Sequence, residues 1–333
     1  MKKLFVYALA VGMFTACSQD ETIEMQSPMQ ISFEGAFVEN ASRADLAANP
    51  STTTESIEAF DVWAFMDTPN GVMLEDENVT KQLGKWSYDN TQYWYQGHKF
   101  YFSALAPMNS TNVKVTTDKA QNAPKYGLGT LNFTNVNGTE DLLYSATMVD
   151  VAADADLSQM ESVKFVFNHL LSKVKFTFKN TFINSNINFE VRDIKMEVPN
   201  NATINLNQEN WWSTNQWLLT LGSFTELEFG TTGKIAVTKE QECADERLTI
   251  PAIAKQSYKV TFTVDLYNGE VLADTYNHTI TLSGVAFEIG KAYDIYAELN
   301  DQNINPNATL KPIIFDVHEV KEWVEPNNVP LNP

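Results

Sequence analysis

The sequence predicts an all-β protein, and three observations lead to that prediction. Apolar and polar side chains alternate at every second position in several runs, which suits a strand with one buried face and would scatter the apolar residues around a helix. Asn-Gly pairs such as Asn268-Gly269 stand between such runs and predict hairpin turns of type I′. Only residues 154–161 suggest a helix, and a short one. With 44% hydrophobic residues among 333, the chain can bury a sizeable core, which excludes a wholly disordered protein.

Residues 1–16 have the pattern of an export signal. Two lysines form a basic start, and the eleven apolar residues from Leu4 to Phe14 are too few to span a membrane. The small residues before Cys17 resemble a bacterial lipobox, although Phe14 stands where leucine is usual. This predicts that Cys17 becomes the lipidated first residue of the mature chain; an ordinary secretory signal with a chance cysteine is the alternative. The next four residues, Ser18-Gln19-Asp20-Glu21, end in an acidic pair and resemble a surface-export signal of Bacteroidetes lipoproteins, so we expect a surface-exposed lipoprotein of the outer membrane.

Strand signals recur from residue 31, after a polar linker at 17–30, to residue 161, and we expect one β-sandwich domain there. Ile31, Phe33 and Phe37 share one face of a first strand. The run from residue 57 to 65 is apolar on both faces, as a central strand would be. Further strands are expected at residues 99–106 and 142–144.

Residues 162–311 show cleaner alternation and predict a second β-sandwich domain. The boundary is placed near residue 162, where an acidic, alanine-rich stretch ends. The apolar runs of period two in this half are residues 163–169, 174–178, 258–266 and 293–299.

The C-terminal residues 312–333 form a separate strand segment. Its apolar side chains are Ile313, Phe315, Val317, Val320 and Trp323. Two prolines bracket the polar residues before it, so the segment is interpreted either as a strand that can leave its own domain or as the last strand of the second domain.

Charge and motifs argue against several classes of function. The net charge of −19 would repel nucleic acid. No nucleophile, zinc or phosphate-binding motif occurs, so we expect no catalytic residues, no metal and no cofactor. Cys243 has no histidine near it in sequence and is interpreted as a structural or incidental thiol.

Three tryptophans, Trp211, Trp212 and Trp217, stand in a polar, asparagine-rich stretch. Exposed tryptophan beside amide side chains can stack on sugars, so these residues are candidate glycan contacts. The alternative is a loop that folds its tryptophans onto the core.

Several blocks in order resemble the fimbrillin family of Bacteroidetes, which comprises type V pilins and their minor subunits. The blocks are residues 57–65, Trp86 with Tyr93-Trp94, 100–107, 141–146, 167–176, 248–252, 290–293 and 320–323. The resemblance implies two transthyretin-like β-sandwich domains in tandem and a structural role in surface fimbriae, with other fimbrial subunits as partners and no catalysis.

The resemblance also implies maturation by an arginine-specific protease that cuts between Arg43 and Ala44. The cut would remove the strand at Ile31–Phe37, and the C-terminal segment of another subunit would take its place, as in donor-strand exchange. The alternatives are a fimbrial tip adhesin or anchor subunit, or a surface lipoprotein that binds host or bacterial glycans or proteins.

Overall fold

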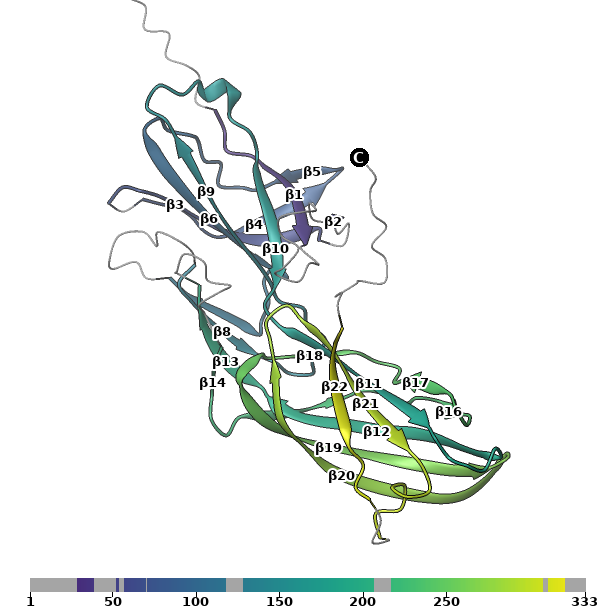
Figure 1. Cartoon of the computed structure of the whole chain (residues 1–333). Coiled ribbons are helices and arrows are strands. Elements are labelled where there is room, and N and C mark those ends of the chain that lie inside the picture. The colour runs from purple at the N-terminus through teal and green to yellow at the C-terminus, as the bar shows by residue number, and fades with distance from the viewer. Residues whose placement is uncertain are drawn as a thin grey trace, which may run out of the picture.

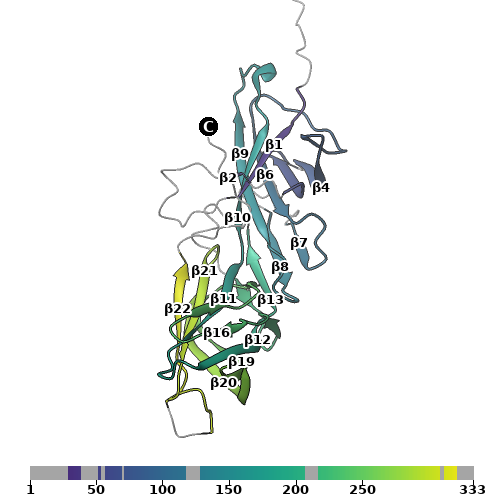
Figure 2. The same ribbon diagram turned by 90° about the vertical axis from the view of Figure 1, so that its right-hand side faces the viewer.

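The computed structural model describes residues 29–38, 52–53, 57–69, 71–117, 128–206, 217–307 and 311–320. Within them the regular structure is nearly all β-strand, as predicted, and the only helix is the 3-10 turn η1 (Leu157–Gln159), inside the stretch where a short helix was expected. The strands form four sheets, arranged in two lobes that lie end to end (Figures 1 and 2). No helix in this part of the chain is long and apolar enough to cross a membrane.

Sheet I builds the first lobe and has eight strands. In spatial order they are β2 (Thr52–Thr53), β1 (Phe33–Val38), β10 (Val163–His169), β9 (Leu143–Val151), β6 (His98–Ala106), β3 (Ala59–Met66), β4 (Val72–Gln82) and β5 (Lys85–Ser87). β3 lies inside the sheet and is buried over six of its eight residues, as its largely apolar run predicts. β1 pairs parallel with β10, whereas the other neighbours in the sheet pair antiparallel.

Sheets II and III build the second lobe and pack face to face. Sheet II contains β17 (Glu240–Glu242), β11 (Ser172–Asn180), β21 (Ala292–Leu299), β22 (Phe315–Val320) and, beside β11, β18 (Arg247–Thr249). Sheet III contains β15 (Phe224–Glu228), β12 (Ile187–Pro199), β19 (Ala252–Asn268), β20 (Val271–Phe287) and, beside β12, β16 (Lys234–Ile235). Their inward faces are the period-two positions, such as Val174, Phe176 and Phe178, which are fully buried in one core.

Sheet IV joins the two lobes. Its strands are β14 (Leu218–Leu219), β13 (Asn201–Asn205), β8 (Thr130–Thr134) and β7 (Val113–Thr116). β8 and β13 come from different halves of the chain and pair over five positions. Their apolar side chains share a core with Trp63 and Phe65 of β3, so the waist of the molecule has a hydrophobic core of its own.

The strand pairing bears on the boundary expected at residue 162. That boundary assigns β10 to the second domain, whereas the hydrogen bonds of β10 join it to β9 and β1 in sheet I. The next strand, β11, begins sheet II. We therefore propose a boundary at Leu170-Leu171, crossed by the β8–β13 ladder.

The hairpin expected at Asn268-Gly269 forms, but with a different turn. Asn268 pairs with Val271, so Gly269 and Glu270 make the two-residue connection between β19 and β20. Gly269 has φ +60°, and Asn268 is not among the residues with positive φ. Glycine at the first central position is the pattern of a type II′ turn, so the predicted type I′ is wrong.

Candidate functional site

The first strand fills an aromatic groove in sheet I. Ile31 is fully buried and Phe33 is 5% exposed. The Phe33 ring centroid lies 5.1 Å from that of Tyr88, 5.7 Å from that of Phe165 and 6.3 Å from that of Phe102. The interior-facing residues of this segment therefore form part of the first lobe's core, as their alternation predicts.

Backbone hydrogen bonds hold the same segment from both sides. Ile31 N donates to Gln92 O at 2.8 Å and Trp94 N donates to Met29 O at 3.0 Å, while on the other side Val163 N donates to Ser32 O at 2.7 Å. The segment is an inserted strand rather than a covering loop.

Tyr88 adds a side-chain contact to this groove. Its hydroxyl donates to Ile31 O at 2.7 Å and accepts from Gln92 N at 3.1 Å. Burial raises the pKa of the Tyr88 phenol, and even its ordinary value near 10 leaves the hydroxyl protonated and able to donate at neutral pH. Nothing in the period-two pattern singled out Tyr88, because its role depends on a strand 57 residues away.

The third expected residue of this strand, Phe37, lies in β1. The ladder shifts register between Glu34 and Ala36, so that Phe37 pairs with Val166 of β10. Its side chain lies outside the described residues, as do Cys17, Arg43 and Ala44.

The C-terminal segment is docked as an edge strand. β22 pairs antiparallel with β21 in the second lobe, the arrangement expected if it is simply the last strand of that domain. Ile313 is 7% exposed, and Phe315 and Val317 are half-buried against the second core, whereas Ile314 is 69% exposed. Val320, expected to continue this apolar face, is 37% exposed, and Trp323 lies outside the described residues.

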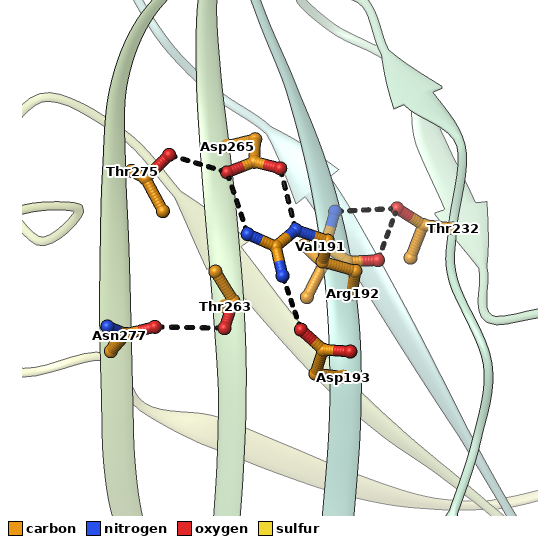
Figure 3. Close-up of polar contacts among 8 residues, drawn as sticks. All are labelled: Val191, Arg192, Asp193, Thr232, Thr263, Asp265, Thr275 and Asn277. Atoms are coloured by element: carbon orange, nitrogen blue, oxygen red, sulfur yellow. Dashed lines mark hydrogen bonds and ion pairs between the residues drawn. The ribbon is translucent and has the colours of Figure 1, made fainter.

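Two of the chain's three arginines are held in strands of the second lobe. The Arg192 guanidinium bonds Asp265 through Nε at 2.7 Å and Nη2 at 3.3 Å, and its Nη1 pairs with Asp193 (Figure 3). Arg247 begins β18 and pairs with Asp245 at 3.1 Å. Neither backbone can enter a protease cleft without breaking its sheet.

The structure corrects the expectation of a glycan contact at Trp217. This indole is 6% exposed, and its Nε1 donates to Leu170 O at 2.9 Å. A buried ring offers no face for a sugar, because the waist core has already covered it. Trp211 and Trp212 lie outside the described residues.

Cys243 belongs to the core of the second lobe. Cys243 is buried, its sulfur accepts from Phe176 N at 3.3 Å, and burial raises its pKa to about 11, so it is a packed thiol and not a thiolate. Among the described residues, no three histidine, cysteine or acidic side chains lie together as a metal site.

Comparison with known proteins places the chain among fimbrial proteins. A fimbrial protein from Bacteroides vulgatus superposes with a TM-score of 0.58 at 14% identity, over 89% of this chain and 100% of its own. A proposed cell adhesion protein from Bacteroides ovatus superposes with a TM-score of 0.52 at 16% identity, over 90% of this chain and 98% of its own. No curated protein sequence matches significantly. The sequence model of the fimbrillin-like family matches residues 43–312, and the chain therefore belongs to that family.

Proposed function

We propose that this protein is a structural subunit of a surface fimbria, exported as a lipoprotein on Cys17, cleaved after Arg43 and joined to its neighbours by donor-strand exchange. Membership of the fimbrillin-like family supports the fimbrial role. The observation that carries strand exchange is a shared pattern: Ile31-Ser32-Phe33-Glu34 and Ile313-Ile314-Phe315-Asp316 have the same apolar residues at the same spacing. In both segments the isoleucine and the phenylalanine face a core.

A cut after Arg43 would separate β1 from the rest of the chain. Arg43 stands between β1 and β2 in sequence, and Arg192 and Arg247 are held in strands. Loss of the segment would expose the rings of Tyr88, Phe102 and Phe165 and leave the backbone groups of residues 92–94 and 163 unpaired. Such a groove accepts an extended strand with the same alternation.

β22 supplies that strand. It is bonded to β21 along one edge, and it leads directly into the chain's C-terminal residues. Donation from one subunit into the groove of the next is a head-to-tail contact, which propagates into a filament and does not close.

The cleavage step is tested with purified filaments. We expect the subunit within them to begin at Ala44, and Arg43→Ala to leave a longer, lipid-bearing form. Arg43→Lys is the matched control, because it keeps the positive charge and denies an arginine-specific protease its residue. If Arg43→Lys matures as wild type does, the claimed specificity is wrong; if Arg43→Ala does, the site is wrong.

The donor step is tested with a peptide of residues 311–320 added to the protein cut after Arg43. We expect the peptide to bind, and an Ile313→Asp peptide to fail. Ile314→Asp is the matched control, since Ile314 is 69% exposed where Ile313 is 7% exposed. Equal binding by the two variant peptides would contradict the proposed face of the donor. Deletion of residues 312–333 should leave a secreted, folded protein that forms no filaments; filaments from that protein would exclude this donor.

The lipid step is tested by metabolic labelling with palmitate. Cys17→Ala should remove the label, and unchanged labelling would exclude the lipobox.

The docked position of β22 favours one alternative role, a tip or anchor subunit. A subunit whose last strand stays in its own lobe donates nothing and ends a filament. An anchor would keep residues 17–43 within purified filaments, so N-terminal sequencing separates it from a shaft subunit.

A further inference from the structure

A polar pocket lies where sheet I meets β7. It has a volume of about 190 Å³, and the residues that line it include Asp61, Trp63, Glu75, Asp76 and Asn109. Asp61 and Trp63 come from β3, the acidic pair from β4, and Asn109 from the turn after β6. This surface is separate from the groove of β1 and from β22.

A bulge brings the acidic pair to the pocket. Val62 pairs with Glu77 and Ala64 pairs with Leu74, so two residues of β4 stand opposite the single residue Trp63. Asp76 adopts φ +55°, a left-handed conformation that Asp and Asn tolerate better than most residues.

Asp61 is the unusual group of this pocket. Its side chain is 4% exposed, and its Oδ2 accepts from Asn109 N at 2.8 Å. Its Oδ1 is buried and has no hydrogen-bond partner in the described protein. A buried carboxylate oxygen without a partner is costly, so the pocket is built to receive something that this oxygen can bind.

The charges around Asp61 favour a cation. The carboxylates of Glu75 and Asp76 line the same pocket, and no lysine or arginine stands among the described residues that line it. Acidic side chains gathered around a buried carboxylate oxygen repel one another, and a bound cation would relieve that repulsion.

We propose that this pocket binds one calcium ion, with Asp61 Oδ1 and the Asp76 carboxylate as its charged protein ligands. The described residues bring no three acidic, histidine or cysteine side chains within ligand distance of one another, so water and neutral oxygens, such as the Asn109 amide, complete the shell. Calcium fits because it accepts six to eight oxygen ligands in adaptable geometry. With few charged ligands, we expect a Kd of about 10⁻⁴–10⁻³ M, the range of extracellular modules. The proposal rests on the proposed function only in that a surface location would expose the pocket to extracellular calcium.

Terbium is the direct probe, because Trp63 lines the same pocket and can sensitise its emission. With purified protein excited through tryptophan, we expect terbium emission that calcium displaces. Asp61→Asn should abolish the emission, and Trp63→Phe should remove it while calorimetry still detects calcium. Asp154→Asn is the matched control, since it removes one carboxylate from an exposed position.

Asp76→Asn keeps the test valid if Asp61→Asn does not fold, because asparagine accepts the left-handed backbone. It should weaken calcium binding by about tenfold or more. Calcium at 10 mM should also raise the melting temperature of the wild type by about 2–5 °C and leave that of the Asp61 variant unchanged.

Two results would overturn the proposal. The first is equal terbium emission from the Asp61→Asn and Asp154→Asn variants. The second is a wild-type melting temperature that 10 mM calcium leaves unchanged. Neither result depends on filament formation. Failure of the calcium proposal would therefore leave the fimbrial proposal intact, and failure of the fimbrial proposal would leave the calcium proposal intact.

Discussion

The two terminal segments carry the same Ile-x-Phe pattern, with the phenylalanine as the first residue of β1 or β22, and they are held very differently. β1 has a neighbouring strand on each side, its first residue Phe33 is 5% exposed, and Ile31, just ahead of that strand, is fully buried. β22 has a strand on one side, and Phe315 and Val317 are only half-buried.

The difference fits the proposed roles, with the groove around β1 as the acceptor and β22 as the donor strand. Burying an apolar side chain stabilises by about 1.5–3 kcal/mol when burial is complete, so the first lobe depends more on its strand than the second lobe does on β22. A chain that loses β1 exposes a groove that would bind a replacement strand tightly. Detaching β22 from its own lobe costs less free energy than detaching β1 from the first lobe.

Phe33→Ala gives the largest expected effect. In the uncut protein it should lower the free energy of unfolding by about 3–5 kcal/mol, because it removes a ring packed on three others in a full core. Urea unfolding measures the loss. Glu34→Ala is the control at an exposed neighbour, and an equal loss in both would break the comparison.

Phe315→Ala should cost less, about 1–3 kcal/mol. Its ring lies 5.8 Å from Phe176 and 6.0 Å from Phe262, but one side of the strand faces solvent. The same urea experiment applies, with the exposed Asp316→Ala as control. A loss as large as that of Phe33→Ala would mean that β22 is no easier to detach than β1.

Tyr88→Phe sharpens the groove side of the comparison. It keeps the ring beside Phe33 and removes the hydroxyl that bonds Ile31 O and Gln92 N, at an expected cost of about 0.5–1.5 kcal/mol. Tyr95→Phe, at a 51% exposed position, should be neutral. A neutral Tyr88→Phe would show that the groove holds its strand through packing alone.

The smallest effect is one of pH on the lobe that holds β22. His278 is 6% exposed and stacks 4.9 Å from Phe262, on which Phe315 rests. Burial lowers the pKa of His278, so the unfolded chain takes up its proton first, near pH 6.5. This contribution to stability is present above that pH and is lost as the pH falls through the folded pKa.

Melting temperatures at pH 7.5 and 5.5 measure that loss. The decrease should be smaller in His278→Gln than in the wild type. The raised pKa of Asp294 acts in the opposite direction in both proteins and cancels in the comparison. An equal decrease in melting temperature in His278→Gln and in the wild type would show that His278 does not contribute to the pH dependence.

Local alternation was enough to predict the strands and much of their burial. Tyr293, Ile295 and Leu299 are buried at alternate positions because a strand beside a core imposes that pattern on its own sequence. Alternation did not predict which strands pair with one another. The parallel pairing of β1 with β10 and the β8–β13 ladder are made by backbone groups, which carry no side-chain signature.

The candidate site was predictable to the same extent. Ile31, Phe33 and Ile313 face cores as their spacing indicates, but Trp217 was misplaced because its partner, Leu170 O, belongs to a segment 47 residues away. Asp61 gave no signal at all, since it sits within an apolar run and becomes distinctive only through a bulge and a turn from elsewhere.

The parallel pairing of β1 has a consequence for the order of events during synthesis. The chain is made from its N-terminus, yet the side of the groove formed by β10 lies about 130 residues further on, as the contact between Ser32 and Ser162 shows. Pairings between such distant residues form late in folding, because the entropy cost of closing a long loop comes before the stabilisation from the new contacts. The leading segment is thus among the first parts to emerge and among the last to settle. Its arrival completes the first lobe, so the piece proposed to be discarded in maturation is also the piece whose docking marks a finished precursor.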